Sequence, residues 1–136
     1  MTWYYIDIEN TGPACLRFFE QVDPKESKFI VYYTTTTPNL SWVFWVSICR
    51  YQNKGFRIEF KKAPPRKESA DKHILVDVAC SAAKCPTRDY VIISDDKGFQ
   101  SPVERICEMT HANVQVHSPS KQFVPDSNEP EDPGTV

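Results

Sequence analysis

The sequence contains no apolar run long enough to span a membrane, which takes roughly 18 or more apolar residues in succession. Asp7 and Glu9 interrupt the first apolar stretch and no basic segment precedes it, so a secretory signal peptide is not expected. We therefore predict a cytoplasmic protein, with the nucleus as the alternative location, and no membrane partner.

The cysteines lack the spacing of a structural zinc site. Their number, five, is odd, and they lie at Cys15, Cys49, Cys80, Cys85 and Cys107. No second Cys pair or paired His follows Cys80 and Cys85 at zinc-site spacing. Together with the absence of a signal peptide, this pattern predicts reduced, mostly buried thiols.

The chain also lacks a strong excess of either charge. The formal net charge is −2, which does not by itself indicate a nucleic-acid-binding protein. Residues 61–72, with the sequence KKAPPRKESADK, are locally basic. On charge alone, a solvated loop is the simplest interpretation of this segment.

Apolar segments with the spacing of a strand alternate along the chain with apolar segments that have the spacing of a helix. A length of 136 residues suits one domain with one core. Alternation of strands and helices predicts an α/β fold in which a central, mainly parallel five-stranded sheet lies between two helical layers. Strands are expected at 2–8, 28–33, 56–60, 90–94 and 113–117, and helices at 14–22, 40–52, 67–84 and 101–110. Residues 1–117 should form the domain, and 118–136 an acidic, Pro-rich, disordered tail.

The helix expected at 40–52 is apolar on two sides. One stripe comprises Leu40, Val43, Phe44, Ile48 and Tyr51, and the other comprises Trp42, Trp45, Val46 and Cys49. One stripe can face the sheet, and the other needs a neighbouring helix, the tail or a second subunit. We predict a protein interface at Trp42 and Trp45, either in a homodimer or with a partner protein.

Acidic residues follow two of the expected strands. Asp7 ends the first strand, and Asp95 with Asp96 follows the fourth. If these strands are neighbours, their carboxyl ends meet at the edge where open α/β sheets bind ligands. Asp71 shares a stripe with Ile74 in the first turn of the 67–84 helix, so it should point over the same edge.

Carboxylates that converge repel one another unless a cation lies between them. Hard divalent ions such as Mg²⁺ or Mn²⁺ take oxygen ligands and support cleavage of phosphodiester bonds. The sequence therefore predicts a Mg²⁺ or Mn²⁺ site with Asp7, Asp71, Asp96 and Asp95 as candidate ligands. The alternative is that Asp7 and Asp95 cap strand ends and that the helix dipole favours Asp71.

Three segments resemble motifs of PIN-like and NYN-domain ribonucleases. They are IDIEN at 6–10, SADKHIL at 69–75 and VIISDDKGF at 91–99, and the resemblance covers about residues 3–117. It implies a PIN-like domain with the Rossmann-like strand order 3-2-1-4-5. It also implies that Asp7, Asp71 and Asp96 are the catalytic metal-binding acids and that Asn10 holds the first loop.

Four further positions bear on this resemblance. Ser94 would support the Asp96 loop, while Glu9 either reaches the site or faces solvent. Many NYN proteins carry another Asp where this chain has Gly98, which leaves three acids in the matched positions. We expect Gly98 in a turn that needs a positive φ, and Phe99 packed on the core.

The resemblance implies RNA as the substrate, in single-stranded form. Cations near the active edge would hold the flanking phosphates, and the candidates are Lys61, Lys62, Arg66, Lys72 and Lys97. No row of aromatic residues interleaved with Arg or Lys suggests base readout, so we expect weak sequence discrimination.

The leading hypothesis is a metal-dependent endoribonuclease. The alternative is a catalytically weak or inactive PIN-like scaffold that binds RNA or partner proteins through the Trp42 and Trp45 helix and the acidic tail. A response-regulator-like phosphoacceptor would also bring acids to a strand edge. It is disfavoured because the final strand, NVQVH, lacks the Lys expected at the end of a late strand.

Overall fold

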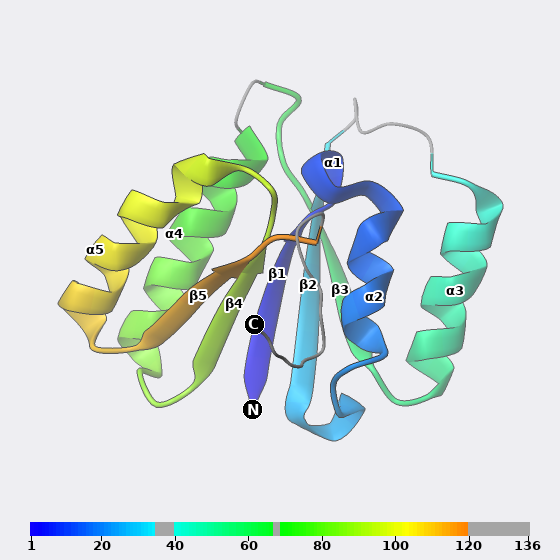
Figure 1. Ribbon diagram of the computed structural model, residues 1–136, viewed down its shortest axis with the longest axis horizontal. Helices are drawn as coiled ribbons and strands as arrows, with labels where there is room; N and C mark the ends of the chain where they lie inside the picture. Colours follow the sequence, from blue (N-terminus) through cyan, green and yellow to red (C-terminus); the bar gives the residue numbers. More distant parts are fainter. Residues whose placement is uncertain (35–39, 67–68, 120–136) are drawn as a thin grey trace, which may run out of the picture.

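The computed structural model describes residues 1–34, 40–66 and 69–119 of the chain. Its centre is one five-stranded, all-parallel sheet with the order β3-β2-β1-β4-β5, as predicted (Figure 1). The strands are β1 Thr2–Asp7, β2 Ser27–Tyr33, β3 Arg57–Lys62, β4 Asp89–Ile93 and β5 Asn113–His117. β1 is central because it is apolar on both faces, whereas the edge strand β3 alternates and is more exposed.

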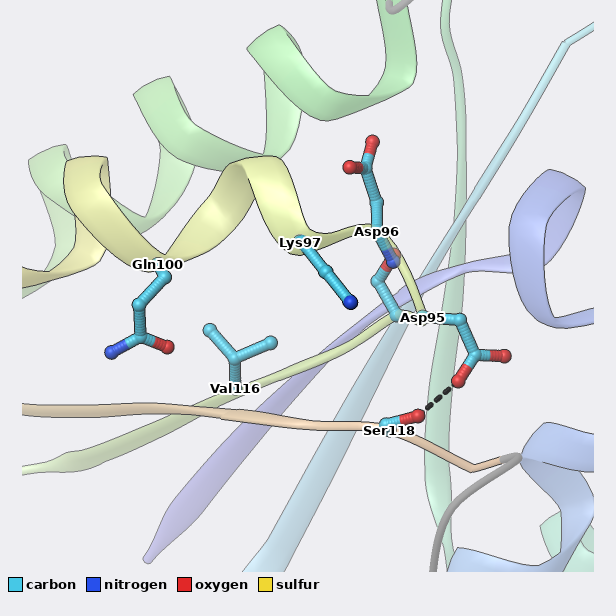
Figure 2. Close-up of a pocket in the computed structure, with 7 residues that line it drawn as sticks. Asp95, Asp96, Lys97, Gln100, Val116 and Ser118 are labelled. Carbon is cyan, nitrogen blue, oxygen red and sulfur yellow. Dashed lines mark hydrogen bonds between the residues drawn. The ribbon is translucent and has the colours of Figure 1, made fainter.

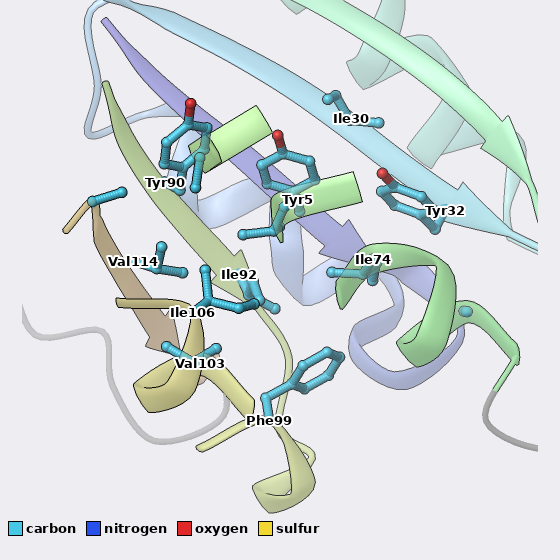
Figure 3. Packing of buried hydrophobic residues seen from close by; sticks show 14 of the residues in the cluster. Tyr5, Ile30, Tyr32, Ile74, Tyr90, Ile92, Phe99, Val103, Ile106 and Val114 are labelled. Carbon is cyan, nitrogen blue, oxygen red and sulfur yellow. The ribbon is translucent and has the colours of Figure 1, made fainter. Parts of the chain in front are cut away.

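Helices cover both faces of the sheet, and each face has its own core. The longer helices are α3 Trp42–Asn53, α4 Ser69–Lys84 and α5 Gln100–Thr110. α4 and α5 lie on one face over side chains that include Tyr5, Tyr32, Tyr90 and Ile92 (Figure 3). α3 lies on the opposite face with the short elements that follow β1. This alternation of faces is what the period of two in the strands predicts.

The connection from β1 to β2 differs from the single helix expected at 14–22. It is built from α1 Ile8–Thr11, the 3₁₀ turn η1 Gly12–Cys15, α2 Leu16–Phe19 and the 3₁₀ turn η2 Pro24–Glu26. Gly12 has a φ of 57°, which ends α1, and Pro13 starts the next turn. The helical segment therefore begins directly after Asp7 and is broken near its middle.

The other element predictions agree with the structure to within about two residues. Ser41 caps α3, because its Oγ accepts a hydrogen bond from the Phe44 backbone N–H at 3.3 Å. The 3₁₀ turn η3 Lys97–Phe99 leads into α5, and Phe99 is buried in the core as expected. Nearly all of the predicted tail, at 120–136, lies outside the described residues. In the part of the chain that is described, no helix combines the length and apolar character needed to cross a membrane.

The face of α3 that turns away from the sheet is exposed and apolar. Phe44 and Ile48 are buried, whereas Trp42 is 75% exposed and Trp45 is 46% exposed. Trp45 still contacts Phe60 of β3, with the two ring centroids 5.5 Å apart. Val43 was placed on the same stripe as Phe44 and Ile48, but it is 55% exposed. The exposed face of α3 consists of Trp42, Val43, Trp45, Val46 and Cys49.

Candidate active site

Asp7 is the last residue of the central strand, and its side chain is only 4% exposed. Burial raises the pKa of this carboxyl, although a hydrogen bond with Asp71 and one with the Asn10 backbone act in the opposite direction. Its Oδ1 is buried and has no hydrogen-bond partner among the described residues. A buried carboxylate oxygen without a partner is costly, so this atom needs a proton or a cation nearby.

Asp71 lies in the first turn of α4 and is partly buried. Burial and hydrogen bonds with Asp96 and Asp7 raise the pKa of its carboxyl to about 8. The contacts with Asp96 and Asp7 therefore favour a proton on the Asp71 carboxyl when no cation is present. The predicted orientation of Asp71 over the sheet edge agrees with this contact.

Asp96 follows β4 and caps the 3₁₀ turn η3. Its Oδ1 accepts a hydrogen bond from the Gly98 backbone N–H at 2.8 Å, and this bond lowers the pKa of the Asp96 carboxyl. Gly98 is not at a positive φ, contrary to the prediction. A Cβ at position 98 would instead lie 3.2 Å from Asp96 Oδ1, which is tighter than an ordinary contact. Glycine at 98 therefore leaves room for the Asp96 carboxylate.

Asn10 ties the loop after β1 to the loop after β4. Its Oδ1 accepts hydrogen bonds from the Asp95 backbone N–H at 2.7 Å and from Ser94 Oγ at 3.2 Å. Ser94 Oγ accepts in turn from the Asp96 backbone N–H at 3.1 Å. These bonds hold the backbone of Asp95 and Asp96 in place, which agrees with the positioning roles expected for Asn10 and Ser94.

One cavity of about 190 Å³ brings the predicted acids together. It is lined by Asp7, Glu9, Asn10, Asp71 and Asp96. Glu9 thus reaches the cavity, and its Oε2 accepts a hydrogen bond from Thr34 Oγ1 of the chain after β2 at 2.8 Å. The cavity therefore contains four carboxylates. The fourth belongs to Glu9, because position 98 is a glycine.

The structure does not bring Asp95 into this cavity. Asp95 and Asp96 leave the loop in different directions, and the Asp95 carboxylate accepts a hydrogen bond from Ser118 (Figure 2). The chain bends at Asp95, and of these two consecutive acids only Asp96 lines the cavity. Asp77 is also outside the cavity, and it pairs with Tyr32 and Lys61.

None of the predicted cations is among the residues that line the acidic cavity, and their settings differ. Arg66 and Lys72 line a separate cavity of about 230 Å³, and Lys97 lines another beside Asp96. Lys61 Nζ is 3.3 Å from Asp77 Oδ2, so part of its charge is already neutralised. Lys62, at the end of β3, is exposed.

The chemistry of this cavity fits a hard divalent cation. Its donors are carboxylate and amide oxygens, which Mg²⁺ and Mn²⁺ prefer, and the buried Oδ1 of Asp7 has no partner among the described residues. Among those residues, however, no group of three or more His, Cys, Asp or Glu side chains is arranged to hold an ion as it stands.

Comparisons with known proteins agree with this architecture. A solved structure of a protein of unknown function from Vibrio parahaemolyticus is 19% identical, with a TM-score of 0.58. The match covers 86% of this chain and 80% of that one, and at this identity it supports the fold alone. No curated protein is similar enough to count as a relative. A family model described as PIN domain matches residues 1–115. Proteins of this family are typically metal-dependent nucleases, and the chain belongs to the PIN domain family.

Proposed function

We propose that the chain is a metal-dependent endoribonuclease that hydrolyses phosphodiester bonds of single-stranded RNA at the cavity of Asp7, Asp71 and Asp96. The observation that carries the proposal is the buried Asp7 Oδ1, which has no hydrogen-bond partner among the described residues and lies in a cavity with three other carboxylates. Such an arrangement is costly for folding, and a bound cation would offset that cost.

Each residue of the cavity has a definite part in this proposal. Asp7, Asp71 and Asp96 would hold Mg²⁺ or Mn²⁺, and Glu9 is placed to orient a water or a further ligand. When bound, such an ion lowers the pKa of water and stabilises charge on the phosphate and leaving oxygen. Asn10 is a positioning residue, because it holds the loop from which Asp96 extends.

The surroundings of the cavity also suit a polyanionic substrate. Arg66 and Lys72 line one further cavity, and Lys97 lines another together with Asp96. Arg66 and Lys72 can offset the repulsion between phosphates and carboxylates and hold the backbone without reading its sequence. We assign Lys62 to the same role, and Lys61 to a weaker one because of its pair with Asp77.

A cleavage assay tests this function. Labelled single-stranded RNA is incubated with the purified protein in Mn²⁺, in Mg²⁺ or in EDTA, beside Asp7→Asn and Asp71→Asn variants. Asp89→Asn is the control, since Asp89 lies at the amino end of β4, whereas the acidic cavity lies at the carboxyl ends of the strands. We expect cleavage by the wild type and the control with metal, and a loss of at least about a hundredfold in the two site variants. Cleavage that persists in EDTA, or in both site variants, would contradict the proposal.

A second candidate function is a binding module, which the exposed face of α3 favours. Isolated surface hydrophobic residues are ordinary, but two exposed tryptophans within one helical turn are not. We propose this face as a contact for a second copy of the chain, with a partner protein as the alternative.

Light scattering over a concentration series tests the contact on α3. We expect the Trp42→Ser and Val46→Ser double variant to be monomeric where the wild type dimerises, while both keep the same circular dichroism spectrum. A wild-type protein that stays monomeric throughout would rule out the homodimer.

A further inference from the structure

A second cavity adjoins the acidic one and is larger. Its volume is about 320 Å³, and it lies where β4 and β5 end and α5 begins (Figure 2). Asp96 lines both cavities, so a molecule bound in one is next to a molecule bound in the other. The volume is at the lower end of the range for small-molecule sites, which suits one ring system.

The walls of this second cavity combine apolar surface with a few polar groups. Val116 of β5 is half-buried and forms an apolar wall, and the carbon stems of Lys97 and Gln100 face it (Figure 2). The Gln100 amide nitrogen donates to Glu104 Oε2 at 3.2 Å, and the carbonyl oxygen lies on the side of Val116. Lys97 forms no ion pair with any of the residues that the structure describes.

Charge decides which part of an RNA could occupy the second cavity. A phosphate would meet the carboxylates of both Asp95 and Asp96, with only Lys97 as a cation, so it is disfavoured. A nucleobase is neutral, and guanine, cytosine and uracil present N–H donors together with carbonyl acceptors. The Gln100 carbonyl oxygen can accept from the donors, and the Lys97 ammonium can donate to a carbonyl.

We propose that this second cavity binds one nucleobase of single-stranded RNA, and that it prefers guanine. The proposal rests on the endoribonuclease function, since the adjacent acidic cavity would hold the phosphate. Guanine combines the O6 acceptor, for Lys97, with N–H donors on the same edge of the ring, for the Gln100 carbonyl. A base held in this way places a neighbouring phosphodiester over Asp96. This differs from the weak sequence discrimination expected from the sequence.

The test uses RNAs of 15 nucleotides that are identical except for one central base. Cleavage rates at that position are compared for the wild type, Gln100→Ala, and Val116→Phe, which fills the cavity. Gln52→Ala on α3 is the matched control for loss of an exposed amide. We expect wild-type cleavage beside guanine to exceed the other bases by about tenfold, and both cavity variants to reduce this preference to about twofold. Wild type and variants with the same base profile would overturn the proposal.

Two further measurements distinguish failure of the base-site proposal from failure of the proposed nuclease function. RNA binding is measured by fluorescence anisotropy in EDTA, where cleavage is not expected. Weaker binding of guanine-containing RNA by Gln100→Ala, without any cleavage by the wild type in Mn²⁺, would support the base site and contradict the nuclease. Metal-dependent cleavage without base preference would support the nuclease and contradict the base site. A Lys97→Met variant that weakens all sequences equally would instead assign Lys97 to the phosphates, and the base site would then lose its only cationic donor.

Discussion

Replacing Asp71 with asparagine should stabilise the metal-free protein at alkaline pH. Burial and hydrogen bonds with Asp96 and Asp7 raise the pKa of Asp71 from 3.8 to about 8 in the folded protein. Between these two values the folded state holds a proton that the unfolded chain has released. The free energy of unfolding therefore falls as pH rises through this window, and asparagine removes that loss.

The size of the effect follows from the same pKa values. At about 1.4 kcal/mol for each tenfold change in proton affinity, the upper bound is about 6 kcal/mol. Asp71 is only partly buried, so solvent screens its charge, and we expect a gain of about 1–2 kcal/mol at pH 8. The gain should shrink toward pH 5, where Asp71 of the wild type is protonated in the folded state.

Urea denaturation in EDTA at pH 5 and pH 8 measures this gain. Asp77→Asn on the same helix is the control, because Asp77 pairs with Tyr32 and Lys61 outside the acidic cavity. An Asp71→Asn variant that is less stable than the wild type at both pH values would refute the account in which the folded protein keeps a proton on Asp71.

Three other changes probe the surroundings of the acids. Asn10→Ala removes the oxygen that accepts hydrogen bonds from the Asp95 N–H and from Ser94 Oγ. We expect urea denaturation to show about 1–2 kcal/mol less stability and the cleavage rate to fall by more than this loss of stability explains. Unchanged stability and cleavage would contradict the positioning role of Asn10. Gly98→Ala puts a Cβ 3.2 Å from Asp96 Oδ1, so Mg²⁺ affinity by calorimetry should fall several-fold while unfolding in urea changes little; equal affinity would show that the carboxylate has room. Mg²⁺ binding by the wild type should release protons and tighten from pH 6 to pH 8, as calorimetry in two buffers can measure; pH-independent binding would mean that the raised pKa of Asp71 plays no part.

The sequence predicts the fold well because each strand is bounded by residues that stop it. Tyr5 and Ile6 of β1 alternate between the two cores, which requires helices on both faces. The segment after Asp7 was harder to predict. Its helical spacing predicts a continuous helix, but Gly12 and Pro13 impose a local backbone geometry that overrides this spacing.

Only part of the site could be predicted from the sequence. Directions set by local structure could be predicted, whereas contacts between residues far apart along the chain could not. Asp71 shares a helix face with Ile74, which is buried, so its direction follows from the helical repeat. The role of Glu9 could not be predicted, since Thr34, which holds it, is 25 residues away. Asp95 was expected as an additional ligand, but its carboxylate instead accepts a hydrogen bond from Ser118, which lies 23 residues further along the chain.

A Mn²⁺ titration tests the central claim most directly, because it asks whether side chains from three separate segments hold one cation. Binding is followed by electron paramagnetic resonance at pH 7.5 for the wild type, Asp7→Asn, Asp71→Asn and the Asp89→Asn control. The account predicts saturable binding by the wild type and the control, and at least about tenfold weaker binding by each site variant. Binding that is equally strong in all four proteins, or absent from the wild type, would contradict it.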